Sequence, residues 1–413
     1  MKSEFAPQYA ASPKLPGSAW QRFARKHVFA QLDCLSGGSI SVVEASRTHQ
    51  FGDPECADGI HGRITVTDPR AYSMLLQRGS IGAGEAYMAG YWQSSDLTRV
   101  IRLLCRNLDA LERIDSGISQ LGNWAQRMNH KLSANTLRGS KRNIHAHYDL
   151  SNELFEIFLD ERMMYSAAMF PTREADLDKA ATFKLQRIGE KLELTPEDHV
   201  IEIGTGWGGL SIYLAEQFGC RVTTTTISEE QRCFAEARIS ERGLTDRITV
   251  LGQDYRELSG SYDKLVSIEM IEAVGQQYLS QYMSKCDSLL KPGGKLLIQA
   301  ITIPEQRYDW ACRNIDFIQR YIFPGGSLPS VEAILRAAGR NSSLQLKHME
   351  DIGHDYARTL KHWHKRFMAN PSRVHALGFD DRFIRMWEFY LCYCEGGFLE
   401  DAIGTAQLVM AKA

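Results

Sequence analysis

The stretch His199-Val-Ile-Glu-Ile-Gly-Thr-Gly-Trp-Gly-Gly-Leu210 decides the fold, because it runs from a buried strand through a glycine-rich turn into a helix. Val200, Ile201 and Ile203 form the short apolar run of a central parallel strand. The turn contains four glycines, which are Gly204, Gly206, Gly208 and Gly209. They let the backbone approach a ligand that a Cβ atom would block, and the following helix directs free N–H groups into the turn. The motif therefore predicts a binding site for a polar cofactor.

The spacing of these glycines favours S-adenosylmethionine over a dinucleotide. Nicotinamide and flavin enzymes use a G-x-G-x-x-G register, with an acidic ribose ligand about 20 residues further on. Here the helix follows Gly208-Gly209 at once, and no acidic residue ends the next strand, expected at 221–227. The alternative is a structural turn whose glycines serve only close packing of helix and strand.

Composition predicts an ordinary globular protein of two or three domains. The 413 residues carry a formal net charge of −2 and are 44% hydrophobic and 24% charged, which argues against nucleic acid as a partner. The nine cysteines lack paired C-x-x-C spacing, so we expect reduced thiols and no bound metal. No stretch reaches about 18 consecutive apolar residues, which predicts a cytoplasmic protein that touches the inner face of the membrane only peripherally.

The chain divides into a small N-terminal α+β domain (1–112), a basic linker (113–143) and a catalytic domain (144–413). Short strands are expected at 39–44, 48–51 and 62–67, separated by Gly and Pro. A helix should open at Asp68-Pro69, and the glycines at 79, 82, 84 and 90 should interrupt the segment that follows. A further helical period runs from Leu97 to Leu111.

Two interpretations of the basic linker remain open. Its cations are Arg127, Lys131, Arg138, Lys141 and Arg142. They either lie on a solvated hinge or meet anionic phosphates at a membrane surface, where each basic residue is worth about 1 kcal/mol.

Strands and helices alternate from about residue 196, which predicts a doubly wound parallel sheet of the class I methyltransferase type. Seven strands are expected, at 200–203, 221–227, 248–251, 264–268, 295–301, 344–348 and 408–411. The last two suggest an antiparallel pair at one edge. Aromatic-rich segments at 304–330 and 356–398 exceed what the sheet needs, so we expect them to form a helical cover over the substrate.

Several motifs outside the glycine turn match one family. They include Met164-Tyr-Ser-Ala-Ala-Met-Phe170, Thr226-Ile-Ser-Glu-Glu-Gln231, Met270-Ile-Glu-Ala-Val-Gly275 and Arg320-Tyr-Ile-Phe-Pro-Gly-Gly-Ser-Leu-Pro-Ser330. With them the chain resembles the cyclopropane fatty acid synthases, from about residue 140 to the C-terminus and again at 79–88. The last of these motifs is the most specific to the family.

The resemblance implies transfer of a methylene or methyl group from S-adenosylmethionine to the double bond of an unsaturated fatty acyl chain of a phospholipid. It also implies transient contact with a membrane surface, and it leaves a homodimer open. By similarity, the residues that would line the cofactor are Tyr165, Ser166, Gly204, Gly206, Trp207, Gly208, Thr226, Gln231, Asp254 and Tyr255.

In the family, a bound bicarbonate ion takes the proton released after methyl transfer. Glu272, Tyr356 and the backbone of Ile301 match positions of its cradle, whereas Ala167 replaces a usual cysteine and Gln299 replaces a usual histidine. Glutamine cannot carry positive charge, so we expect weaker binding of the anion. Either Gln299 is a tolerated ligand, or another group, such as Glu272 itself, is the base and the product differs.

Aromatic side chains and one thiol are candidates for the acyl channel: Tyr308, Trp310, Phe317, Tyr321, Phe323 and Cys394. The aromatic rings could equally belong to an ordinary core, although aromatic faces also stabilise a passing carbocation.

Three functions follow from the sequence. The first is formation of a cyclopropane fatty acid through a carbocation. The second is methylation to a methyl-branched, methylene or furan-precursor chain, because Gln299 stands in the place of histidine. The third is an inactive lipid-binding scaffold.

Overall fold

The computed structural model describes residues 17–57, 59–108 and 150–413, which form two compact units. The first unit contains the described residues up to 108 together with Arg385–Phe389, and the second contains the rest. The linker expected at 113–143 lies outside the described residues. Its two interpretations therefore stay open.

The first unit is built on a four-stranded sheet in the order β2-β1-β3-β4. Its strands are β1 (Gly38–Glu44), β2 (Arg47–Gly52), β3 (Ile60–Val66) and β4 (Trp92–Ser94). Strand β1 runs parallel to β3, whereas the other two pairs are antiparallel. Its helices are α1 (Ala19–Leu32), α2 (Arg70–Met88) and α3 (Leu97–Arg106).

The segment α2 confirms the expected interruption at Gly79 and corrects it at Gly82 and Gly84, which lie within the helix. Gly79 leaves the helical conformation, with a φ of +54°, and kinks the segment, which continues as helix to Met88. Gly90, with a φ of +73°, follows the end of the helix. A Cβ atom on Gly82 would lie 2.0 Å from the carbonyl oxygen of Met74. Gly82 thus permits a close approach of the two halves of the kinked helix and does not end it.

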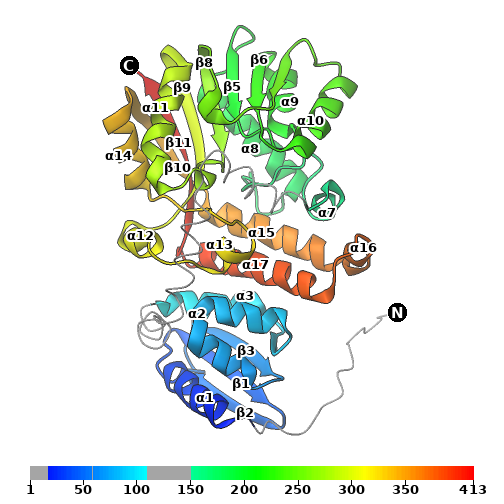
Figure 1. The fold of residues 1–413 in the computed structure, drawn as a ribbon, viewed down its shortest axis with the longest axis vertical. Helices are drawn as coiled ribbons and strands as arrows, with labels where there is room; N and C mark the ends of the chain where they lie inside the picture. The colour runs from blue at the N-terminus through cyan, green and yellow to red at the C-terminus, as the bar shows by residue number, and fades with distance from the viewer. Residues whose placement is uncertain (1–16, 58, 109–149) are drawn as a thin grey trace. The chain divides into compact units, whose positions relative to one another are not determined.

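The second unit contains the predicted seven-stranded sheet, in the order β10-β11-β9-β8-β5-β6-β7 (Figure 1). Its strands are β5 (His199–Ile203), β6 (Arg221–Thr225), β7 (Ile248–Leu251), β8 (Tyr262–Ile268), β9 (Leu290–Thr302), β10 (Leu344–Asp351) and β11 (Gly404–Lys412). The five strands from β5 to β9 pair in parallel, and β11 lies antiparallel between β9 and β10. The doubly wound fold and the antiparallel edge are therefore confirmed.

Helices cover both faces of this sheet because successive strand residues point to opposite sides. Val200, Val266 and Val409 pack with the helices α8, α9 and α10. Their neighbours Ile201, Leu265 and Leu408 pack with α11 and α14 on the other face. The bounds are α8 (Leu177–Leu192), α9 (Gly209–Phe218), α10 (Glu229–Glu241), α11 (Leu279–Leu289) and α14 (Val331–Asn341).

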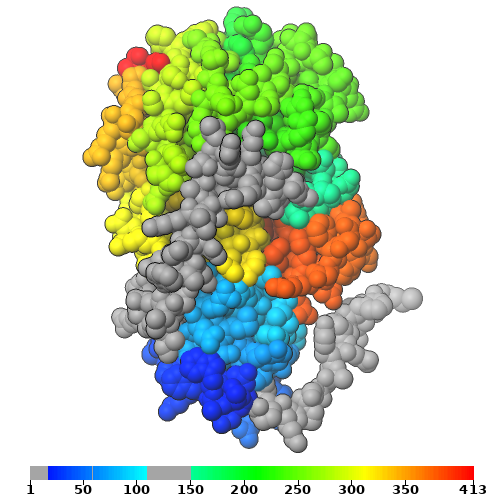
Figure 2. All heavy atoms as spheres, in the orientation of Figure 1, coloured from blue at the N-terminus to red at the C-terminus, as the bar shows by residue number. Residues whose placement is uncertain are grey.

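The aromatic-rich segments form additional helices. They are α12 (Glu305–Ala311), α13 (Phe317–Tyr321), α15 (Gly353–Met368), α16 (Pro371–Ala376) and α17 (Asp381–Leu399). The short elements α7 (Asn152–Glu156), η1 (Tyr255–Glu257), η2 (Ile271–Ala273) and η3 (Gln276–Tyr278) complete the second unit. Figure 2 shows side chains of α15 to α17, in orange, on the visible surface. In the part of the chain that the structure describes, no helix combines the length and apolar character needed to cross a lipid bilayer.

Packing between α8 and α9 yields a test of this fold. A Cβ atom on Gly189 would lie 2.2 Å from the ring of Phe218, whereas a Cβ atom on Gly339, in α14, meets nothing within 4 Å. Gly189→Ala should destabilise the protein by about 1–3 kcal/mol through overpacking. Gly339→Ala should stabilise it by up to about 1 kcal/mol, because alanine favours the helix. Urea unfolding measures both changes, and equal effects of the two substitutions would contradict the α8–α9 contact.

Candidate active site

The glycine turn after β5 provides open space for a ligand. Gly204, Gly206 and Gly208 all have positive φ angles, of +104°, +51° and +82°. A Cβ atom on Gly206 would meet no atom of residues 17–57, 59–108 or 150–413 within 4 Å, whereas one on Gly209 would lie 2.4 Å from the carbonyl oxygen of Arg162. Gly209 therefore serves packing, and Gly206 borders space that suits a cofactor.

A buried carboxyl group ties this turn to its surroundings. Glu202 accepts hydrogen bonds from the hydroxyls of Thr224 (2.6 Å) and Ser211. Thr205, inside the turn, shares a hydrogen bond of 2.8 Å with Thr224. Burial raises the pKa of Glu202 to about 7. The group connects β5, β6 and α9, and so fixes the position of the turn.

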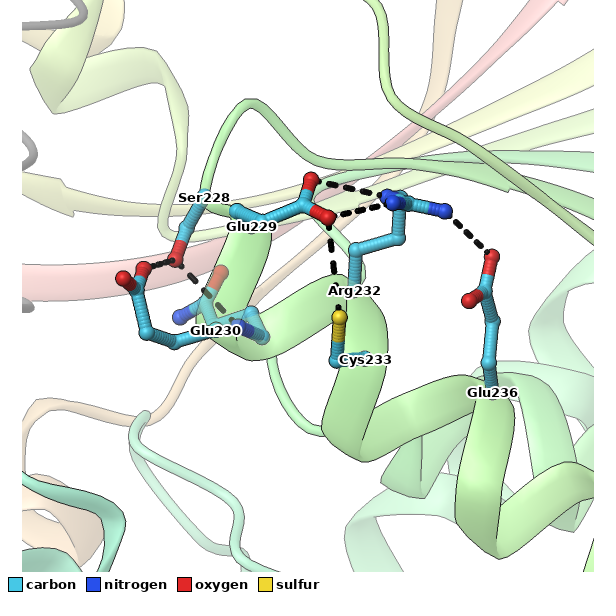
Figure 3. Close-up of polar contacts among 7 residues, drawn as sticks. Ser228, Glu229, Glu230, Arg232, Cys233 and Glu236 are labelled. Atoms are coloured by element: carbon cyan, nitrogen blue, oxygen red, sulfur yellow. Dashed lines mark hydrogen bonds and ion pairs between the residues drawn. The ribbon is translucent and has the colours of Figure 1, made fainter.

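The Thr226–Gln231 motif forms the start of α10. The Thr226 hydroxyl donates to Oε1 of Gln231 over 2.9 Å, and both residues are buried. Ser228 caps the helix by accepting from the Gln231 N–H at 3.3 Å. On the outer side of α10, Arg232 pairs with Glu229 and Glu236 (Figure 3). The cap and the Thr226–Gln231 hydrogen bond thus tie the end of the loop after β6 to the first turn of α10.

Asp254 and Tyr255 already have protein partners. The Asp254 carboxylate pairs with the Arg256 guanidinium at 2.7 Å. The Tyr255 ring packs edge-on against Tyr282 with centroids 5.3 Å apart, and burial raises its pKa to about 12. Their expected role as cofactor ligands stays a prediction.

The segment after α7 brings three further predicted residues together. The Trp207 indole donates to Asn152 at 2.7 Å. The Tyr165 hydroxyl shares a hydrogen bond of 3.0 Å with that of Tyr390. Ser166 accepts from the ammonium of Lys184 at 2.6 Å.

Glu269 occupies the centre of the site. It follows β8 directly and has a φ of +50°, a left-handed conformation that is uncommon outside glycine. Its Oε1 accepts from the Ala167 N–H (2.9 Å) and from Nε2 of Gln299 (2.8 Å). Its Oε2 accepts from the Tyr356 hydroxyl at 2.8 Å. Three separate segments therefore converge on one carboxylate.

Glu272 provides a second carboxyl group, with a different environment. Its Oε1 accepts a short hydrogen bond from the Ile301 N–H. Its Oε2 is buried and has no hydrogen-bond partner among the described residues. Burial and the neighbouring charge of Glu269 raise the pKa of Glu272 to about 8.

Lys184, on α8, supplies the opposing charge. Its side chain is fully buried, and burial lowers its pKa to about 8. Its charge attracts the carboxylates of Glu269 and Asp160. Burial raises the pKa of Glu269, and the attraction of Lys184 opposes that increase.

The donors that the resemblance assigned to bicarbonate are thus engaged by the protein itself. The N–H of Ala167, the hydroxyl of Tyr356 and the amide of Gln299 donate to Glu269, and the N–H of Ile301 donates to Glu272. The cradle expected for a free anion therefore holds the Glu269 carboxylate in this structure, and the residues present do not fit a bicarbonate ion.

Glu269 and Lys184 are site residues that were not predicted from the sequence. Glu269 had a usable signal, since it comes directly after the strand expected at 264–268, where ligands of doubly wound sheets gather. Lys184 lies within an amphipathic helix and had no such signal. Its role emerges only from the burial of its ammonium group.

The substrate candidates divide into two groups. Phe323 lies beside Tyr165 and Tyr390, with ring centroids 6.2 and 6.1 Å apart, and Cys394 interacts electrostatically with Tyr356 and Tyr390. The others lie on α12 and α13. There the ring of Phe317 lies tilted against that of Tyr321 with centroids 5.1 Å apart, Trp310 faces Arg307, and Tyr308 interacts with Cys312. The structure therefore brings Phe323 and Cys394 to the carboxylate site and leaves the channel role of the rest a prediction.

Comparisons with known proteins identify the family and the fold. A family model described as mycolic acid cyclopropane synthetase matches residues 135–408. Tuberculostearic acid methyltransferase UfaA1 of Mycobacterium tuberculosis is 40% identical over 84% of this chain and 85% of its own. The cyclopropane-fatty-acyl-phospholipid synthase of Escherichia coli is 35% identical over 84% of this chain and 87% of its own. The crystal structure of mycolic acid cyclopropane synthase CmaA1 with SAH and CTAB is similar with a TM-score of 0.61 and 26% identity, over 66% of this chain and 98% of that one.

The open space beside Gly206 predicts a specific loss of cofactor binding. Gly206→Val should abolish binding of S-adenosylmethionine in calorimetry, because the new side chain enters the space where the ligand would lie. Gly243→Val is the matched control, since Gly243 has a similar φ of +65° and also no atom within 4 Å of a Cβ. The backbone strain is comparable, so equal affinities of the two variants would remove the cofactor assignment.

The raised pKa of Glu272 predicts a pH-dependent effect on stability. The carboxyl has a pKa of about 8 when folded and an ordinary value of 4.5, so between these values the folded protein holds a proton that the unfolded chain releases. The stability of the parent should consequently fall as pH rises from 4.5 to 8. Glu272→Gln removes this titration, so the variant should gain stability relative to the parent between pH 5 and pH 8. If the difference in unfolding free energy between the parent and Glu272→Gln stayed constant across this range in denaturant titrations, the burial of the Glu272 carboxyl would be contradicted. Glu236→Gln, on the exposed side of α10, serves as the control.

Proposed function

This chain belongs to the mycolic acid cyclopropane synthetase family, and we propose that it modifies the double bond of an unsaturated fatty acyl chain of a phospholipid. Its fold is that of methyltransferases that bind S-adenosylmethionine. To the family and the fold we add three proposals, which concern the substrate class, the proton acceptor and the product. One observation carries it, which is the buried pair of carboxyl groups, Glu269 and Glu272, at the carboxyl ends of the strands near the glycine turn.

The cofactor, when bound, supplies an electrophilic methyl group. The residues of the chain would hold the alkene beside this methyl in a site shielded from water, because an isolated double bond is a weak nucleophile. The ring of Tyr165 has Phe155, Trp363 and Phe323 around it, with centroids between 5.2 and 6.2 Å away. These aromatic faces suit the positive charge that develops on the acyl chain.

A carboxylate of the protein then takes the proton. Burial raises the pKa of both carboxyls, that of Glu272 to about 8, and three donors and the Lys184 ammonium oppose the increase at Glu269. The two carboxyls titrate as a coupled pair, and Glu269, with three donors against one at Glu272, is better placed to carry the negative charge of that pair. Glu269 therefore replaces bicarbonate as the proton acceptor, while Tyr356 and Gln299 orient it.

The position of the lost proton decides the product. Loss from the newly added methyl closes a cyclopropane ring, which is the product we propose. Loss from a neighbouring carbon of the chain would leave a methyl-branched alkene, and a 1,2-hydride shift followed by proton loss from the added methyl would give a methylene chain. Reduction of either product by a separate hydride donor would then give a saturated methyl branch. The 40% identical tuberculostearic acid methyltransferase and the replacement of the usual histidine by Gln299 support this second candidate.

The phospholipid substrate implies contact with a membrane surface. We propose a transient, peripheral association, in which the acyl chain reaches the site from the bilayer. An inactive lipid-binding scaffold is the remaining alternative. The intact glycine turn and the buried carboxyl pair argue against it.

Lipid mass spectrometry tests the function. Expression in a bacterial host that lacks cyclopropane fatty acids should add 14 mass units to unsaturated acyl chains, and fragmentation should then separate a ring from a branch. Turnover of the purified protein on unsaturated phospholipid vesicles should be the same with and without added bicarbonate. Glu269→Ala should lower turnover by a factor of about 100 or more, the range typical of a lost general base, with unchanged cofactor affinity.

Bicarbonate or formate should partly restore turnover of Glu269→Ala, because the vacated donors would then bind the small anion. Glu236→Ala removes an exposed carboxylate and should leave turnover unchanged. Strong bicarbonate dependence of the parent enzyme, or an unaffected Glu269→Ala variant, would show that a free anion is the base.

A further inference from the structure

Two fully buried glutamines connect Glu269 to the far end of α8. Gln299 and Gln407 are direct partners in the antiparallel pairing of β9 and β11, and both are 0% exposed. Nε2 of Gln407 donates to Oε1 of Gln299 over 2.9 Å. Nε2 of Gln299 in turn donates to Glu269 over 2.8 Å. At the other end, the ammonium of Lys191 donates a short hydrogen bond to Oε1 of Gln407.

The lysine fixes the direction of this chain of amides. An ammonium group has three donors and no acceptor, so only the oxygen of Gln407 can face Lys191. The nitrogen of Gln407 must then face Gln299, and it can bond only to the oxygen of that amide. The remaining nitrogen of Gln299 is thereby directed at Glu269. Each step follows from donor and acceptor chemistry, and reversal of one amide requires reversal of the other.

We propose that Lys191 is a positioning residue that acts through Gln407 and Gln299 to keep an N–H donor on Glu269. This inference deepens the proposed function, because it assumes that the ionised Glu269 takes the proton. The reversed chain would place the carbonyl oxygen of Gln299 against the carboxylate. Two acceptors repel each other, so this arrangement is compatible only with a protonated Glu269.

The other groups that face Glu269 do not depend on the direction of the amides. They are the N–H of Ala167, Lys184 on α8, Glu272 in η2, Tyr356 on α15 and Tyr390 on α17. A backbone N–H, an ammonium and a phenol that donates to Glu269 keep their roles when the amides reverse. Nε2 of Gln299 also donates to the carbonyl oxygen of Ala167 over 3.3 Å, a longer contact that favours the same orientation of the amide. Gln299 is nevertheless the side chain whose reversal would exchange a donor for an acceptor at Glu269, so its orientation decides this contact.

A surface role for Lys191 has to be separated from this positioning role. Its ammonium also forms an ion pair with Glu350 on β10, whose side chain is 34% exposed, while that of Lys191 is 6% exposed. If Lys191 only anchored β10 to α8, loss of either partner would have the same effect. The positioning role instead requires the lysine and tolerates the loss of Glu350.

The experiment compares Lys191→Met, Lys191→Arg, Glu350→Gln and the parent as full-length proteins. The main readout is the pH dependence of kcat/KM on unsaturated phosphatidylethanolamine–phosphatidylglycerol vesicles between pH 5 and pH 8. Lys191→Met should move the midpoint of the ascending limb upward by about one pH unit, a tenfold change in proton affinity. Lys191→Arg restores a group that only donates, so its midpoint should match that of the parent, as should that of Glu350→Gln.

A second readout does not need activity. If the pKa of Glu269 is higher in Lys191→Met, the folded variant holds an extra proton over a wider pH range than the folded parent. The free energy of unfolding of Lys191→Met should therefore fall further with rising pH than that of the parent. This loss should be absent in Glu350→Gln. Identical pH profiles and stability curves for Lys191→Met and the parent would overturn the positioning role. Absence of acyl modification in the parent, together with the stability difference, would overturn the proposed function and leave the amide chain intact.

Discussion

The burial of the Glu269 carboxylate is the constraint on which the rest of the site depends. A buried carboxylate is costly unless hydrogen bonds and an opposite charge compensate it. Here the compensation comes from Ala167, Gln299 and Tyr356, with Lys184 as the nearby cation. These residues lie in four separate elements of the chain, so the charge can be accommodated only when the sheet and its covering helices are assembled.

The same constraint explains why Gln299 takes the place of a histidine. An imidazole that can become positively charged suits a mobile anion, which has to be captured from solvent. A carboxylate attached to the chain needs no capture, and a neutral amide is enough to donate to it. The Gln299 amide can face Glu269 with its nitrogen or with its oxygen, and Gln407 and Lys191 favour the orientation in which the nitrogen donates. Charge is thus placed at the ends of the polar chain, on Lys191 and on Glu269.

The electrostatic balance of the site also separates its two carboxyl groups. Among the described residues, Glu269 has three donors and a nearby ammonium, whereas Glu272 has one donor and a buried oxygen without a partner. The surroundings therefore favour the ionised form at Glu269 more than at Glu272. Such a division of roles between neighbouring carboxyls is common in acid–base catalysis. In this protein the difference arises from position along the chain. Glu269, directly after β8, accepts from Ala167, Gln299 and Tyr356, whereas Glu272, in η2, accepts from the N–H of Ile301.

The sequence alone determined the doubly wound sheet, the glycine turn, the family and the positions of Glu272, Gln299 and Tyr356, because these depend on local periodicity and on motifs contiguous in the chain. It could not determine which group those donors bind. The contacts of Glu269 join residues up to 102 positions apart, and Lys191 reaches Gln407 over 216 positions. Likewise, Gly82 resembled a helix breaker as Gly79 does, until its close approach to Met74 showed its packing role. Tertiary structure decided these points because hydrogen-bond partners and burial are properties of the assembled fold.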